Sequence, residues 1–63
     1  MSPAQKLAIK RKAERLVRLA YNLEAEASAF RALGLSTEAD WINGLASDIG
    51  KAGRSFRNQG EQS

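Results

Sequence analysis

The side chains best suited to chemistry in this sequence are two pairs of acidic residues, Glu24 with Glu26 and Glu38 with Asp40. Paired carboxylates transfer protons or hold a divalent metal when they converge on one site. Here the members of each pair are two positions apart, so on a helix they point to different sides. The chain has no histidine and no cysteine, which removes the commonest acid–base catalyst and the usual zinc and haem ligands. We therefore expect a protein that is not an enzyme, with no cofactor, metal site or small-molecule substrate.

The basic residues are concentrated near the start of the chain. Residues 1–19 carry six basic side chains and one acidic one (net +5), residues 20–48 carry one basic and five acidic ones (net −4), and the remainder carries three basic and one acidic (net +2). A basic helix face can follow nucleic-acid phosphates, and the residues for this RNA or DNA alternative are Lys6, Lys10, Arg11, Arg15, Arg18 and Arg54. It can also steer the chain toward an acidic protein surface, and the residues for this reading are Lys10, Arg11, Arg15 and Arg18. A third explanation is that this end pairs with the acidic segment of a second copy.

Val17, Tyr21 and Glu24 form a small patch that the helix seam described below does not cover. At ~100° per residue, Val17 and Tyr21 lie one turn apart and well round the helix from Leu16. An exposed aromatic and aliphatic pair is a suitable anchor for a partner protein. The alternative is that the pair forms the shoulder of a wide dimer core.

The residues from Ile9 to Gly34 predict the helix that must carry these groups. Large apolar residues recur every seven positions, and we call them the large row of this helix: Ile9, Leu16, Leu23 and Phe30. Small residues recur at the same spacing and form its small row: Ala13, Ala20, Ala27 and Gly34. Both rows lie on one helix face, and the small row allows a second backbone to approach closely.

The two ends of this helix are also specified. Ser2 is suited to the N-cap position, Pro3 to the first helical position and Gln5 to the return contact of a capping box. Gly34 is suited to the left-handed position that ends a helix, and Leu35 can then contact Phe30. We predict a helix over residues 3–33 and a turn over 34–36.

A second helix is predicted over residues 37–56. Its large row is Ile42, Leu45, Ile49, Ala52 and Phe56, and its small row is Ala39, Ala46, Gly50 and Gly53. Three glycines within the helix cost about 3 kcal/mol relative to alanine, so packing against the first helix must stabilise it. Residues 1–57 then form one domain, and the polar residues 58–63 are predicted to be a disordered tail.

A short turn requires the two helices to be antiparallel. If the turn is centred on residues 35–37, opposed residues have numbers that sum to about 72, which pairs Ala27 with Leu45 and Ala20 with Ala52. Every pair at this register is apolar. The predicted fold is therefore all-α, a two-helix antiparallel hairpin resembling a coiled coil with an alanine-rich seam.

A hairpin of this size is too small to bury enough apolar surface by itself. A chain of 63 residues without cysteine has no disulfide or common metal site to stabilise it, so association remains. Apolar residues beside the seam widen the apolar face toward that of a four-helix bundle, and the dimer-interface candidates are Ile9, Leu19, Leu33 and Trp41. We expect a homodimer, with two hairpins head to tail so that each basic end lies beside an acidic turn.

This layout, with one turn at Gly34 and an alanine row beside a large row, resembles the plasmid Rop (Rom) family of helical hairpins. The resemblance implies a dimeric four-helix bundle that binds paired RNA loops. That family has a phenylalanine on its RNA-facing helices, which has no match here because Phe30 and Phe56 both belong to the seam. The resemblance therefore assigns RNA binding to no position in this chain. Short, alanine-rich two-helix chains are also similar in style to the accessory proteins with which phages block host systems, including anti-CRISPR proteins and anti-host regulators.

These observations predict a small protein-binding regulator or inhibitor. We expect it to act as a homodimer on a host protein with an acidic surface, in the manner of proteins encoded by phages or mobile elements. The alternative is a Rop-like nucleic-acid binder that uses the basic end. The sequence has no apolar run of the ~20 residues that a membrane span needs and no signal peptide, so we expect a cytoplasmic protein that does not bind membranes.

Overall fold

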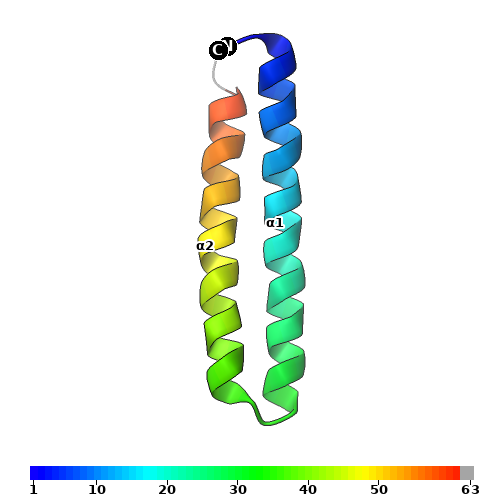
Figure 1. Cartoon of the computed structure of the whole chain (residues 1–63), viewed down its shortest axis with the longest axis vertical. Helices are drawn as coiled ribbons and strands as arrows, with labels where there is room; N and C mark the ends of the chain where they lie inside the picture. Colours follow the sequence, from blue (N-terminus) through cyan, green and yellow to red (C-terminus); the bar gives the residue numbers. More distant parts are fainter. Residues whose placement is uncertain (62–63) are drawn as a thin grey trace.

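The computed structural model describes residues 1–61, which form two antiparallel α-helices joined by one turn (Figure 1). Helix α1 spans Pro3–Ala32 and helix α2 spans Ser36–Glu61. They lie side by side in a rod whose Cα atoms extend 48 × 13 × 9 Å. The predicted all-α hairpin is confirmed, and the first helix ends one residue before the predicted boundary.

The start of α1 has the predicted capping box. The Gln5 backbone N–H donates to the Ser2 hydroxyl oxygen at 3.2 Å, and the Ser2 backbone N–H donates to Gln5 Oε1 at 3.0 Å. Pro3 occupies the first turn, where its missing N–H costs no hydrogen bond. Two backbone donors at the helix start are thereby satisfied without any tertiary contact.

The turn is a Schellman motif closed by an ion pair. Gly34 has a φ of 88°, its N–H donates to the Arg31 carbonyl oxygen at 3.0 Å, and the Leu35 N–H donates to the Phe30 carbonyl oxygen at 3.0 Å. Arg31 in the last turn of α1 then reaches across to Asp40 in α2, with Nη2 2.7 Å from Oδ1. These contacts fix the direction in which α2 leaves the turn.

The two helices meet through their small residues. The buried positions of the hairpin are all alanine or glycine: Ala13, Ala20 and Ala27 in α1, and Ala39, Ala46, Gly50, Gly53 and Gly60 in α2. No large side chain among residues 1–61 is fully buried. Side chains of one carbon or none let the two backbones approach closely, so the contact is narrow and lies along the rod axis.

The predicted pairing of the helices is wrong in detail. It placed Leu45 against Ala27 and Ala52 against Ala20, yet Leu45 is 59% exposed and Ala52 is also exposed. Instead, a Cβ atom built on Gly50 would lie 3.7 Å from the Ala20 Cβ atom. The sequence argument placed the large row of α2 against both rows of α1, whereas close approach of the backbones requires the small row of α2 at the contact.

The second helix is longer than predicted. It continues through Glu61, so the prediction of a disordered tail is wrong over residues 58–61, and residues 62–63 lie outside the described part of the chain. Gly60 explains the extension, because a Cβ atom placed on it would lie 3.1 Å from the Lys6 carbonyl oxygen and 3.2 Å from Lys10 Cγ. Lys10 Nζ also lies 3.9 Å from Glu61 Oε1. The first turns of α1 are therefore covered by α2.

Two glycines of α2 provide a matched test of this close contact. A Cβ atom added at Gly53 would lie 3.0 Å from Val17 Cγ2 and 3.1 Å from the Ala13 carbonyl oxygen, whereas one added at Gly44 meets nothing within 4 Å. Gly44→Ala should raise the free energy of unfolding by about 1 kcal/mol through helix propensity. Gly53→Ala gains the same propensity but overpacks the contact, so it should be less stable than Gly44→Ala by about 1–3 kcal/mol.

Urea unfolding followed by circular dichroism at one fixed protein concentration measures this difference. Equal stabilisation by the two substitutions would show that the helices are not held together through Gly53.

Candidate interaction site

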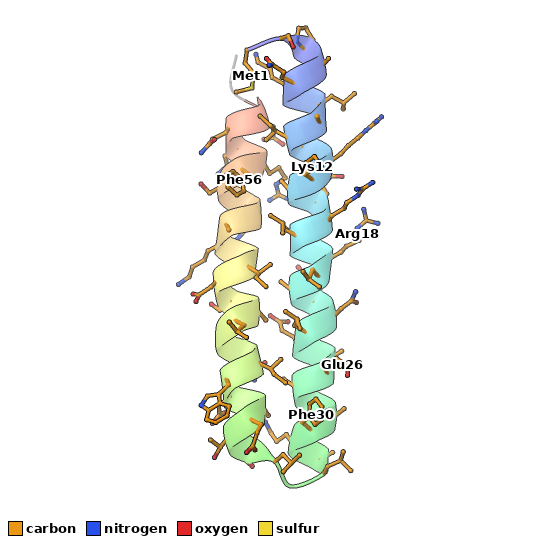
Figure 2. All side chains as sticks on the ribbon, viewed as in Figure 1. Met1, Lys12, Arg18, Glu26, Phe30 and Phe56 are labelled. Carbon is orange, nitrogen blue, oxygen red and sulfur yellow. The ribbon has the colours of Figure 1, made fainter. Side chains whose placement is uncertain are left out.

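The large apolar side chains gather on one side of the hairpin. We define the large-residue face as Ile9, Leu16, Leu23 and Phe30 of α1 with Ile42, Leu45, Ile49 and Phe56 of α2. Figure 2 shows Phe30 and Phe56, one from each helix, on the side turned toward the viewer. Because the small rows occupy the contact itself, the heptad spacing turns both large rows to the same side of it.

This face is only partly covered within the hairpin. Leu45 and Phe56 are 59% and 47% exposed, and the four large residues of α1 are half-buried. Near the open end of the hairpin, a groove is lined by Ile9, Leu16 and Phe56, with Lys12 and Arg15 at its border. An apolar surface that runs along both helices of a small protein marks an interaction site.

The opposite side of the hairpin carries the predicted protein-binding patch. Val17, Tyr21 and Glu24 line one groove there, and its other lining residues are Ala20, Ala46, Ser47, Gly50 and Arg54. We call this side the tyrosine face. Tyr21 is 65% exposed, so the structure brings the three predicted residues together on a surface separate from the large-residue face.

Two residues of the tyrosine face were not assigned to it from the sequence. Arg54 Nη1 would lie 3.2 Å from a Cβ atom built on Gly50, so the guanidinium folds over that glycine. Ser47 lines the same groove. The correct pairing of Gly50 with Ala20 would have placed both beside Tyr21, and the register error concealed them.

The predicted basic contact residues are spread around α1. Lys10 is half-buried beside Gly60 and Arg15 borders the apolar groove, whereas Arg11 is exposed and Arg18 points away from α2 (Figure 2). They do not form a single cluster with Tyr21. They share one half of the rod, where they supply charge in several directions.

The antiparallel fold makes that half of the rod strongly basic. Residues 1–19 (net +5) lie beside residues 49–61 (net +2), which gives the open half a charge of +7. Residues 20–48 on both sides of the turn carry −4. The hairpin is therefore a rod with oppositely charged ends, which the sequence blocks predict once the chain folds back.

The four predicted dimer-interface residues differ in how much of their surface the hairpin covers. Ile9 lines the apolar groove. Leu19, Leu33 and Trp41 are 45%, 75% and 66% exposed, so little of the hairpin covers them. Their part in a dimer remains a prediction.

Residues 1–61 contain neither a candidate metal site nor a helix that could span a membrane. No group of three or more acidic, histidine or cysteine residues gathers there to hold a metal ion. Neither helix has, in the described chain, a stretch long and apolar enough to cross a membrane.

Comparison with protein families, curated proteins and solved structures found no match for this chain. The resemblance to the Rop family is therefore supported as a shared hairpin layout and at no finer level.

Self-association through the large-residue face can be tested by placing a charge on it. Phe56→Glu introduces a carboxylate among apolar side chains, which a second copy would have to bury at a high energetic cost. Ser55→Glu adds the same charge at the adjacent exposed position, on another side of the helix. We expect sedimentation equilibrium to give a dimer mass for the wild type and Ser55→Glu, and a monomer mass for Phe56→Glu.

A wild-type mass that stays monomeric at all concentrations would contradict this expectation. So would a Phe56→Glu variant that dimerises like the wild type.

Proposed function

We propose that this protein is a non-enzymatic regulator or inhibitor that acts as a homodimer by binding a target protein. The observation that supports this most strongly is the division of the hairpin into two chemically different faces. The large-residue face is apolar along both helices, which suits pairing with a second copy in a four-helix bundle. The tyrosine face stays available on the outside of such a bundle.

The tyrosine face has the composition of a small protein-binding site. Val17 and Tyr21 offer an aliphatic and an aromatic anchor, and the floor of the groove is made by Ala20, Ala46 and Gly50. Tyrosine in particular supplies a large contact area at a small cost in side-chain entropy. We propose Tyr21 as the principal anchor.

The basic half of the rod suits a target with an acidic surface. Opposite charge on the two surfaces accelerates encounter and orients the rod before the tyrosine face makes contact. We assign this steering role to the basic residues Lys10, Arg11, Arg15 and Arg18. They point in several directions and form no single pocket, so they act through their summed charge. A small inhibitor encoded by a phage or mobile element and directed at a cytoplasmic host protein fits this description.

A nucleic-acid binder is the second candidate, and the +7 charge of the open half favours it. The Rop-like layout is consistent with this candidate, since that family binds RNA. Against it, Phe56, which lines the groove bordered by Lys12 and Arg15, belongs to the large-residue face that a second copy would cover, so in the proposed dimer it is not free to stack on unpaired bases.

Tyr21→Ala tests the first proposal against the matched variant Asn22→Ala, which removes an exposed polar side chain one position away. A target captured from cells that carry the gene and then purified should bind Tyr21→Ala at least about tenfold more weakly, as expected for loss of an aromatic anchor. It should bind Asn22→Ala like the wild type. Equal losses for the two variants, or none for Tyr21→Ala, would contradict the assignment.

The second candidate requires its own measurement. Fluorescence anisotropy with labelled RNA and DNA should show steeply salt-dependent binding if phosphates are contacted, and Arg11→Glu with Arg15→Glu should abolish that binding. The proposed protein-binding function predicts no such binding at physiological salt.

A further inference from the structure

We propose that a second copy of this chain covers the large-residue face in the opposite orientation, related by a twofold axis that passes between the two copies, level with the point between Leu19 and Ala20 of α1. This inference rests on the homodimer of the proposed function and adds its orientation, its register and the residues in contact. An axis at right angles to the helices stacks α1 on α1 and α2 on α2 of the second copy, both antiparallel.

The large row of α1 is complementary to itself in this arrangement. Reversal about the point between Leu19 and Ala20 brings Ile9 opposite Phe30 of the partner subunit and Leu16 opposite Leu23 of the partner subunit. All four side chains are half-buried within one hairpin, so each has surface left for a second copy. Leu19 lies almost on the axis and is 45% exposed.

The large row of α2 gives an independent estimate of the axis. Four of its five residues, from Leu45 through Ile49 and Ala52 to Phe56, are spaced by four, three and four residues, which reads the same in both directions, whereas Ile42 comes opposite Gln59 of the partner subunit. Its centre lies between Gly50 and Lys51. A twofold rotation about an axis level with this centre brings Leu45 opposite Phe56 of the partner subunit and Ile49 opposite Ala52 of the partner subunit.

The hairpin itself connects the two estimates. A Cβ atom on Gly50 would lie 3.7 Å from the Ala20 Cβ atom, so position 20 of α1 is level with position 50 of α2. The centre of the α1 row and the centre of the α2 row therefore agree within about one residue, or ~1.5 Å along the rod. A single axis satisfies both helices, as twofold symmetry requires.

The charge distribution selects the same orientation. Head-to-tail packing places the +7 half of each hairpin over the −4 half of the other, whereas packing with the open ends together would place +7 beside +7. One pair is specific: Lys12, which borders the apolar groove, is level with position 27 of the partner subunit and so lies within one residue, about 1.5 Å along the rod, of Glu26 of the partner subunit. The tyrosine face lies on the far side of each hairpin and stays open to a target.

Single cysteine variants test the orientation, because the natural chain contains no cysteine. Leu19→Cys places a thiol almost on the proposed axis, and a short bismaleimide should link it to its copy. Leu35→Cys places a thiol in the turn, where head-to-tail packing separates the two copies by roughly 40 Å at 1.5 Å per residue. We expect a covalent dimer from Leu19→Cys and none from Leu35→Cys.

The possible outcomes separate this inference from the proposed function. Cross-linking of Leu35→Cys would overturn the orientation and leave a homodimer. A dimer mass without cross-linking of Leu19→Cys would overturn the register. A monomer mass for the wild type would overturn the homodimer of the proposed function as well.

Charge exchange provides a second readout that does not depend on cysteine. Lys12→Glu and Glu26→Lys each place like charges opposite one another in the proposed register, and each should weaken dimerisation by roughly tenfold. The double variant restores opposite charges and should recover wild-type dimerisation in sedimentation equilibrium. A double variant weakened by the product of the two single losses would overturn the contact between these residues.

Discussion

The close approach of two rows of alanine and glycine determines the rest of this structure. Ala20 against Gly50, and Val17 and Ala13 against Gly53, leave no space for larger side chains at the helix contact. The large side chains are consequently displaced to one side of that contact, where both helices contribute them to a single apolar face. A contact between large residues would have buried the same side chains within the hairpin and left no such face. The small rows thus convert a narrow helix pair into a surface suited to association.

Charge adds a direction to this surface. Folding the chain back brings the basic first third beside the basic last quarter and isolates the acidic middle at the turn, so that the rod has oppositely charged ends. In the proposed dimer, the apolar face determines where the second hairpin packs, and the charge determines its orientation. The tyrosine face depends on neither, which leaves Tyr21 and Arg54 free for a different molecule.

The fold could be predicted largely from local signals. Ser2, Pro3 and Gln5 specify the start of α1, Gly34 specifies its end, and the heptad rows specify two helices; all of these are properties of neighbouring residues. The register could not be predicted in the same way, because it depends on how closely two backbones approach. Because the large and small rows have the same spacing, the sequence pattern is compatible with either row at the helix contact. That single error concealed Arg54 and Ser47 beside Tyr21. The extension of α2 to Glu61 was missed because the residues after Arg57 are polar, and Gly60, seven positions after Gly53, was not assigned to the small row.

The contact between the small rows is tested most directly by proton–proton nuclear Overhauser effects in a labelled sample. The structure predicts strong effects between the Ala20 methyl group and the Gly50 α protons, since a Cβ atom on Gly50 would lie 3.7 Å from that methyl carbon. It predicts no comparably strong effect between Ala27 and the Leu45 side chain within one hairpin, because Leu45 is 59% exposed and belongs to the large-residue face. Strong effects between Ala27 and Leu45, without any between Ala20 and Gly50, would place the large rows at the contact and contradict the two-faced hairpin.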